Sequence, residues 1–256
     1  MADLAVLLSG ALIGVLLGTF GGGGSILAAP LLLYVGGVAD THRALGTAAA
    51  AVALIAAFGL WRQARAGRVK WPCALVFGAA GLVGALLGAR LALKVDGKVL
   101  LLAFAGAMAL VGLSMLRTAR GTGDAHVTLG SANALRLVPV GGAVGAASGF
   151  FGIGGGFLIV PGLMFAAGMT MLHASAASLL SVAVFGTATA ATYAQAGLVD
   201  GRLVALLIVG GAAGSLIGVR AARLLGERQR AARIAFALAI VAVAALVGAD
   251  AASALR

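Results

Sequence analysis

Two glycine-rich runs contain the residues whose types and spacing could do chemistry. The first run reads GTFGGGGSILAAP at 18–30, and the second reads GFFGIGGGFLIVP at 149–161. Each run lies between apolar stretches, where replacing alanine by glycine costs a helix about 1 kcal/mol. Glycine also leaves the backbone N–H groups bare, so that a ligand can touch them. A helix that restarts after such a run offers unpaired N–H groups and the positive end of its dipole to an anion.

We therefore predict that an anion binds at the two breaks, where helices restart near Ser25 and Gly156. Hydroxyl groups in the segments that follow, HRALGTA at 42–48 and HASAASLLS at 173–181, could donate hydrogen bonds to its oxygens. The histidines that open these segments, His42 and His173, could carry a coupling proton. The predicted substrate-binding residues are Gly21, Gly22, Gly23, Gly24, Ser25, Thr47, Gly152, Gly154, Gly155, Gly156, Ser175 and Ser178.

Each of these residue types also has a structural interpretation. Glycines permit close helix packing in membranes, hydroxyls bond to carbonyls of their own helix, and a histidine near the interface caps or anchors a helix. Arg90 and Arg220 match across the two halves and fit either an anion clamp or an extension to lipid headgroups. A second polar string, with no partner in the first half, consists of Thr187, Thr189, Thr192 and Gln195.

The acidic residues favour an anionic substrate. All seven lie in or near predicted helix ends and loops: Asp3, Asp40, Asp96, Asp124, Asp200, Glu227 and Asp250. A cation that crosses a membrane commonly needs a carboxylate inside the membrane. We therefore expect a small organic or inorganic anion as substrate, and we expect no cofactor and no metal ion.

The composition places these elements in a membrane. The 256 residues are 62% hydrophobic and 10% charged, with a mean hydropathy of +1.14. A soluble domain cannot bury that much apolar surface, whereas lipid accepts it on the outside of a helical bundle. The net charge of +11 falls in short segments between apolar runs, where basic residues signal topology. We expect membrane lipid as a partner, and no nucleic acid.

The chain consists of two similar halves. At an offset of 131 residues, positions 18–50 share ten identities with the second half, up to His42 and His173. Composition alone would give roughly four, by a crude test for internal repeats. Farther along, GALLGAR at 84–90 aligns with GSLIGVR at 214–220 at an offset of 130. This duplication places one glycine break near the start of each half.

The basic loops predict that the halves are inverted. WRQARAGRVKW at 61–71 carries four basic residues and no acid, whereas its counterpart at 194–202 has one of each sign. By the positive-inside rule, only the first loop is cytoplasmic, so equivalent loops lie on opposite faces. The segment 90–99 is then assigned outside, despite three basic residues.

The predicted fold is an all-α polytopic membrane protein with two inverted-topology repeats of about five helical segments each. A glycine-rich broken helical hairpin opens each repeat. We assign 1–118 to the first repeat, 119–132 to a linker and 133–256 to the second repeat. The apolar stretches fall at 4–17, 26–38, 44–60, 73–92, 99–116, 133–150, 155–168, 174–194, 203–220 and 231–248.

These motifs resemble the sulfite exporter TauE/SafE family, also described as toluene-sulfonate uptake permeases. The resemblance rests on FGGGGSILAAPLLL with HRALGTA, on FGIGGGFLIVPGL with HASAASLLS, and on GAR at 88–90 echoed by GVR at 218–220. It covers essentially the whole chain. It implies a multi-pass transporter of the bacterial inner membrane for small sulfur-containing or carboxylated anions, such as sulfite, sulfoacetate or other organosulfonates. Direction stays open, and a homodimer is plausible by analogy.

The two half-sites are expected to differ chemically. At the 131-residue offset Ser25 stands where the second half has Gly156, and Ala48 and Ala49 stand opposite Leu179 and Leu180. Such asymmetry would suit a substrate with one anionic end and an organic tail.

We predict a secondary transporter that works by alternating access, with the anion held at the two breaks. The alternative is a passive anion channel of the same architecture. An intramembrane enzyme would need a nucleophile with a base, or a metal cluster, and neither three scattered histidines nor Cys73 alone offers that spacing. The glycine runs also lack the last glycine of GxGxxG, and they do not follow a strand as a nucleotide-binding loop would.

Overall fold

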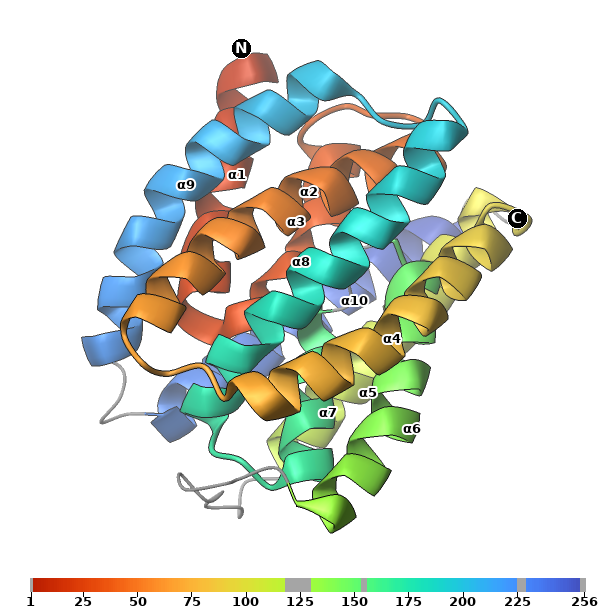
Figure 1. The fold of residues 1–256 in the computed structure, drawn as a ribbon. Helices are drawn as coiled ribbons and strands as arrows, with labels where there is room; N and C mark the ends of the chain where they lie inside the picture. Colours follow the sequence, from red (N-terminus) through yellow and green to blue (C-terminus); the bar gives the residue numbers. More distant parts are fainter. Residues whose placement is uncertain (1, 118–129, 153–155, 225–228, 254–256) are drawn as a thin grey trace.

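A computed structural model describes residues 2–117, 130–152, 156–224 and 229–253 (Figure 1). Within these ranges all the regular elements are helical. In chain order they are α1 (Ala2–Phe20), the 3-10 helix η1 (Gly21–Leu27), α2 (Ala28–Tyr34), α3 (Thr41–Arg65), α4 (Trp71–Ala92), α5 (Gly97–Arg117), α6 (Ser131–Phe150), α7 (Gly156–Ala167), α8 (Met171–Gln195), α9 (Gly201–Leu224) and α10 (Gln229–Ser253).

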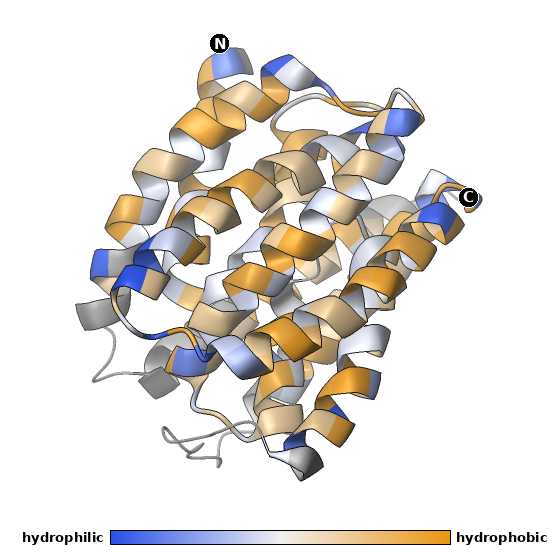
Figure 2. Cartoon of the chain, viewed as in Figure 1, coloured by the Kyte–Doolittle hydropathy of each residue, from blue (hydrophilic) through white to orange (hydrophobic). Residues whose placement is uncertain are grey.

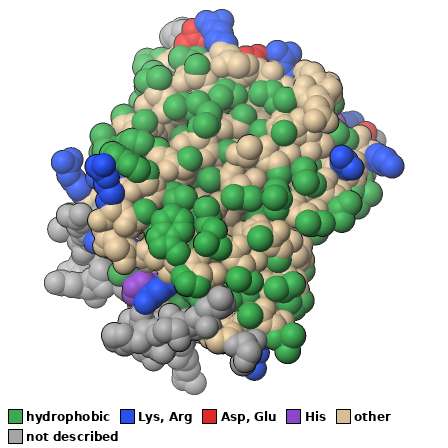
Figure 3. Space-filling model, viewed as in Figure 1, with side chains coloured by type: hydrophobic (Ala, Val, Ile, Leu, Met, Phe, Trp, Pro, Cys, Tyr) green, Lys and Arg blue, Asp and Glu red, His purple; other side chains and the backbone are tan. Residues whose placement is uncertain are grey.

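The helices form a bundle with an apolar middle and polar ends. Six candidate membrane spans occur in the described part, at Asp3–Tyr34, Thr41–Arg65, Trp71–Ala92, Gly97–Ser114, Met171–Gln195 and Gly201–Gly218. Hydrophobic residues fill the middle of the helices and hydrophilic ones gather at their ends (Figure 2). On the face drawn in Figure 3, hydrophobic side chains cover the centre, and Lys and Arg lie at the margins. The predicted all-α polytopic membrane fold is confirmed.

The duplication extends to backbone conformation. The described glycines with positive φ form three pairs, Gly21 with Gly152, Gly37 with Gly168 and Gly67 with Gly197, with φ between 64° and 73°. Helices α3 and α8 both have 25 residues, and they begin 130 residues apart. Side chains with a Cβ rarely adopt this left-handed conformation, so glycine is needed wherever the chain turns in this way. The domain boundaries stay a prediction, and linker residues 119–129 lie outside the described residues.

Equivalent helices α3 and α8 pack against each other in opposite directions. Gly46, near the start of α3, lies against Tyr193 near the end of α8, and Gly59, near the end of α3, lies against Leu179. Inverted repeats require that equivalent helices run antiparallel, and α3 and α8 do so. Inversion of the complete halves stays a prediction.

In the other main contacts, a helix of one half also packs on a helix of the other half. Helix α1 packs along α9, and α6 packs along α4, although α4 and α9 are equivalents. Gly14 lies on the backbone of Gly211 in the first pair, and Gly145 lies on Gly81 in the second. A Cβ on either glycine would overlap backbone atoms of its partner helix. Bare backbone therefore sets the close approach of both pairs.

The first break differs from its prediction. The sequence predicts an α-helix that restarts near Ser25, but η1 continues to Leu27 and α2 begins at Ala28. Gly21 reverses the chain with φ +64°, and Gly24 then packs on Leu16 and Leu17 of α1, where a Cβ would meet the Leu16 Cβ at 2.8 Å. The tighter 3-10 winding accommodates this turn. In the second half the structure describes α7 from Gly156, in agreement with the predicted restart, and residues 153–155 before it lie outside the described residues.

The two ends of the bundle carry different charges. At one end, the last turn of α3 contributes Arg62 and Arg65, and the loop between α3 and α4 contributes Arg68 and Lys70. At the opposite end, where α3 begins, Arg43 pairs with Asp200, and His42 bonds to Val95 of the α4–α5 loop. Segment 90–99 therefore lies at the end of the bundle opposite to 61–71, and its assignment to the outside of the membrane stays a prediction. That the α3–α4 loop faces the cytoplasm, as the positive-inside rule predicts, stays a prediction.

Candidate functional site

The two glycine breaks meet at the centre of the bundle. Gly22 of η1 lies against Gly156, the first residue of α7: a Cβ on Gly22 would lie 2.8 Å from the Gly156 Cα. Gly21 to Ser25 are all buried, and so is Gly156. Residues more than 130 positions apart in the sequence thus form one backbone contact, which lies beside the first half of α8.

Ser178 of α8 holds the first break in place. Its fully buried hydroxyl accepts a hydrogen bond from the Gly22 N–H at 3.0 Å and donates one to the Ser175 carbonyl at 2.8 Å. The neighbouring Gly21 packs directly on the Ser175 backbone. An amide that is free in the sequence-based prediction is therefore paired with a side chain of the second half.

The second break rests on an apolar side chain. Gly152 packs on Leu45 of α3, where a Cβ would lie 2.7 Å from the Leu45 Cβ. Since α3 and α8 begin 130 residues apart, Leu45 occupies the position in α3 that Ser175 occupies in α8. One break therefore packs on serines and the other on leucine, which agrees with the expectation that the half-sites are chemically unequal.

The contact between the breaks is closed in this conformation. The Ser25 hydroxyl donates to the Gly22 carbonyl at 2.9 Å, and a Cβ on Gly22 would also lie 2.6 Å from Cγ2 of Val182. No oxyanion fits between Gly22 and Gly156 as they stand, so anion binding there requires the breaks to separate. The predicted ligands Gly154 and Gly155 lie outside the described residues.

The repeat alignment shifts by one residue before α3 and α8. The pair Gly37 and Gly168 keeps the 131-residue offset, but the N-caps Asp40 and Thr170 are 130 apart. At the 130-residue offset of α3 and α8, His42 corresponds to position 172 and not to His173. The gapless sequence alignment, which paired the two histidines, is therefore corrected. The stretch from the positive-φ glycine to the N-cap is one residue shorter in the second half.

The two histidines lie at opposite ends of the α3–α8 pair. Nε2 of His42 lies 3.1 Å from the Val95 carbonyl, and Nδ1 of His173 lies 2.8 Å from the Thr170 hydroxyl. Because α3 and α8 are antiparallel, the structure does not bring these rings together. Their role in proton coupling stays a prediction.

Thr47 belongs to a network at the start of α9. Its buried hydroxyl accepts the Asp200 N–H at 3.0 Å. The Asp200 carboxylate accepts the N–H groups of Arg202 and Leu203 and pairs with Arg43 at 2.8 Å. The Leu203 N–H, followed by Arg43, holds the pKa of the Asp200 carboxyl below its usual range. The structure thus places Thr47 on the side of α3 that faces the start of α9, where it holds Asp200, whose carboxylate caps that helix.

Sequence reasoning missed Ser148, which lies one turn before Gly152 in α6. It is fully buried, and its hydroxyl has no hydrogen-bond partner in the protein. The sequence could have indicated it, because Ser148 is a lone serine within one turn of the break, in a segment that otherwise contains only glycine and apolar residues. Among the described residues, no three His, Cys, Asp or Glu side chains gather as a metal site would require.

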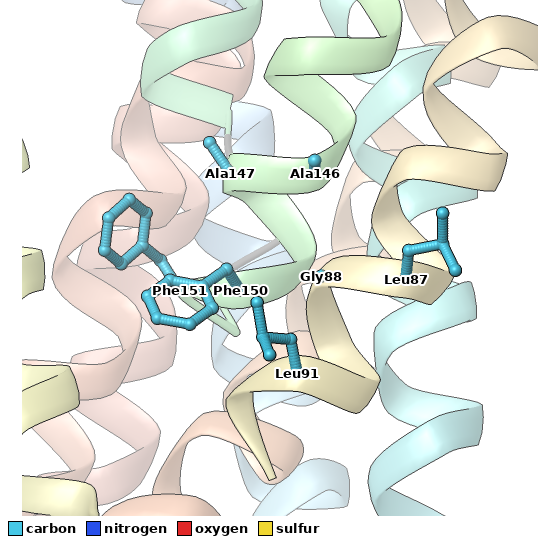
Figure 4. Close-up of a pocket in the computed structure, with 7 residues that line it drawn as sticks. All are labelled: Leu87, Gly88, Leu91, Ala146, Ala147, Phe150 and Phe151. Atoms are coloured by element: carbon cyan, nitrogen blue, oxygen red, sulfur yellow. The ribbon is translucent and has the colours of Figure 1, made fainter. Parts of the chain in front are cut away.

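An apolar groove of 440 Å³ lies between α4 and α6 beside the second break (Figure 4). Leu87 and Leu91 of α4 line one wall, and Phe150 and Phe151 at the end of α6 line the other. Phe151 directly precedes Gly152, so the groove adjoins the break without offering it any polar side chain.

Three comparisons relate the chain to known proteins. A family model described as "Sulfite exporter TauE/SafE" matches residues 6–247. The chain is 45% identical over 246 residues to a "Probable membrane transporter protein" of Xylella fastidiosa (strain 9a5c), covering 93% of this chain and 92% of the relative. It is 28% identical over 211 residues to the "Probable membrane transporter protein YdhB" of Bacillus subtilis (strain 168), covering 82% and 86%. No solved structure matches the chain.

Proposed function

Because the chain belongs to the sulfite exporter TauE/SafE family and is thus a multi-pass bacterial membrane transporter, we propose that it moves a small organic or inorganic anion by alternating access. The substrate class is sulfur-containing or carboxylated: sulfite, sulfoacetate or another organosulfonate. The anion binds between the two glycine breaks when they part.

The observation that carries this proposal is the contact of Gly22 with Gly156. Each belongs to a break that the duplication places near the start of a half, and both are buried. Gly22 lies within the candidate membrane span Asp3–Tyr34, and Gly156 lies just before the shorter apolar stretch Leu158–Ala167. Backbone without α-helical winding is stable at membrane depth only where protein or water satisfies it. Such paired breaks at the interface of repeats are typical of transport sites.

Backbone amides and hydroxyls supply the attraction for an anion. The Gly22 N–H now donates to the Ser178 hydroxyl oxygen at 3.0 Å and becomes available as a donor when the break leaves α8. The Ser178 hydroxyl, which now donates to the Ser175 carbonyl at 2.8 Å, can then turn its proton toward the anion. Four carboxylates of the described part of the chain lie at helix ends and not beside the breaks: those of Asp3, Asp40, Asp96 and Asp200. Amide donors without a nearby carboxylate favour a negative solute.

The closed contact supports alternating access. Separation of Gly22 from Gly156 would open the centre, and the antiparallel α3–α8 pair offers two opposite directions in which a hairpin can move. In inverted repeats the two halves exchange conformations, so that the centre faces first one side of the membrane and then the other.

Uptake of labelled sulfite and sulfoacetate into proteoliposomes tests the function. We expect Gly22→Ala to lower uptake at least tenfold, because its Cβ would lie 2.6 Å from Val182 and 2.8 Å from Gly156. Gly106→Ala is the matched control, since a Cβ there has no atom within 4 Å. Both variants are first shown to be folded by gel filtration and circular dichroism.

A folded Gly22→Ala protein that transports both anions like the wild type contradicts the proposed site. Counterflow separates the two mechanisms: saturable accumulation driven by unlabelled anion indicates a carrier, whereas conductance at channel rates indicates the passive anion channel.

A further inference from the structure

One face of α8 carries a row of buried polar side chains. Ser178, Ser181, Thr189 and Tyr193, with Phe185 between them, follow each other at intervals of three or four residues. Side chains at this spacing lie on one face of a helix, here within about 120° of arc over about 22 Å. All five residues are fully buried. The row begins at the first glycine break and ends beside His42 of α3.

Most of these polar atoms have no partner in the protein. The hydroxyls of Ser181, Thr189 and Tyr193 are buried and form no hydrogen bond. Other hydroxyls of α8 behave differently: Thr187 donates to the Ala183 carbonyl at 2.7 Å, and Thr192 donates to Ala188 at 2.9 Å. Buried hydroxyls are rarely left unpaired in native proteins, and ordered water commonly supplies the missing partner.

The row ends on a further unpaired atom. The His42 ring lies 6.2 Å from the Tyr193 ring, and its Nδ1 atom is buried without a partner. Since Nε2 lies 3.1 Å from the Val95 carbonyl, a neutral His42 ring carries its proton on Nε2 and leaves a lone pair on Nδ1. Hydroxyls and an acceptor nitrogen together suit a chain of hydrogen-bonded water.

The row has free space beside Ser181 and is blocked one turn further along, at Phe185. A Cβ added to Gly78 of α4 would meet no atom nearer than the Ser181 hydroxyl oxygen, at 3.8 Å, so there is space beside this unpaired hydroxyl. One turn along, the Phe185 ring fills the space over Gly81 and stacks on Phe77 with ring centroids 6.5 Å apart. Phe185 thus separates Ser181 from Thr189.

We propose that this face of α8 is a hydrated passage from the membrane end at His42 to the glycine breaks at Ser178, closed at Phe185. It carries water and the anionic group of the substrate to the centre. The inference rests on the proposed anion transport, but it concerns different residues and has a separate readout. By the charges of the loops, the entrance at His42 faces away from the cytoplasm.

Cysteine accessibility tests the passage. In a Cys73→Ala background, Ser181→Cys, Thr189→Cys and Leu179→Cys are made singly; Leu179 is equally buried but packs toward Gly59 of α3. Modification by the membrane-impermeant anion sulfonatoethyl methanethiosulfonate, added at the His42 end, is followed by intact mass. We expect Thr189→Cys to react at least tenfold faster than Leu179→Cys, and Ser181→Cys to do so only when combined with Phe185→Ala.

Equal, slow reaction of all three variants with and without Phe185→Ala overturns the proposal.

Unsubstituted protein gives a second measurement that does not depend on the folding of variants. Radiolytic hydroxyl labelling should oxidise buried Tyr193, normalised to denatured protein, at least fivefold more than buried Phe104, because radicals form from adjacent water. Labelling of Tyr193 at the Phe104 level also overturns it. Accessible cysteines in a protein that moves neither sulfite nor sulfoacetate would contradict the proposed substrate and leave the passage standing.

Discussion

At the residue scale, the hydroxyls that follow each break have separate tasks. Ser178 bonds to Gly22 and so connects the two halves at the centre, whereas Thr47 receives the Asp200 N–H at the start of α9. Both are fully buried, and both lie in similar short motifs. Only Ser178 contacts a break, so it is the better candidate for a residue that donates to the substrate.

Asp200 gives a prediction of pH dependence. Its pKa is lowered by the Leu203 N–H first and by Arg43 among the further causes, so the folded state favours the carboxylate. The stabilisation is present above the unfolded pKa of about 4 and is lost as the pH falls through the lower folded pKa. Because the Arg43 side chain is 51% exposed and screened by solvent, the contribution is small, on the order of 1 kcal/mol.

We therefore expect Asp200→Asn to lower the melting temperature at pH 7 by a few degrees, and we expect this difference to shrink as the pH falls below 4 and through the lowered pKa of the folded-state carboxyl. Asp3→Asn is the control, since the Asp3–Arg202 pair is 55% and 74% exposed. Melting curves in detergent from pH 3 to 8 provide the measurement. A constant difference between wild type and Asp200→Asn across that range would show that the charge is irrelevant.

At the element scale, glycine determines which helices meet. Helix α1 packs on α9, and α6 packs on α4, through glycines that lie directly against backbone atoms of the partner helix. The hydrophobic effect does not favour one apolar helix partner over another inside lipid, so close backbone packing sets the pairing. The same glycine-rich composition that weakens the helices therefore assembles them.

Gly145 tests this interpretation. We expect Gly145→Ala to lower the melting temperature in detergent, because its Cβ would overlap the backbone of Gly81. Gly106→Ala should raise it slightly or leave it unchanged, since space is open there and alanine favours a helix by about 1 kcal/mol. Equal melting temperatures for the two variants would mean that α4 and α6 can separate without cost.

At the scale of the whole molecule, two similar halves build one centre. The α3–α8 pair crosses antiparallel, the glycine breaks meet beside it, and helices α1 and α6 each pack on a helix of the opposite half. Neither half contains both breaks, so each alone lacks the contact on which transport is proposed to depend. The two halves also differ, because serines support one break and Leu45 supports the other.

Inverted topology is tested at two equivalent loops. Ala66 and Ala196 follow the ends of α3 and α8 at an offset of 130 residues, and both are exposed. In a Cys73→Ala background, an impermeant maleimide should label Ala196→Cys in intact cells and should label Ala66→Cys only after permeabilisation. Labelling of both variants from the same side of the membrane would exclude inverted repeats.

The sequence by itself determined the helices, the duplication and the family. Apolar composition forces helices in lipid because every backbone group must be paired within its own segment, and this requirement is local. The paired glycines also marked the turns at Gly21 and Gly152, since φ near +65° is a property of single residues. These features follow from neighbours along the chain.

Only the tertiary structure decided what each break contacts. Gly22 bonds to Ser178, 156 residues away, Thr47 bonds to Asp200, and the unpaired hydroxyls of α8 line up toward His42. The register shift before α3 and α8, and the later start of α2 at Ala28, likewise depend on how the hairpins pack. In an apolar bundle many helix faces look alike in sequence, so close backbone contacts between distant segments choose which faces meet.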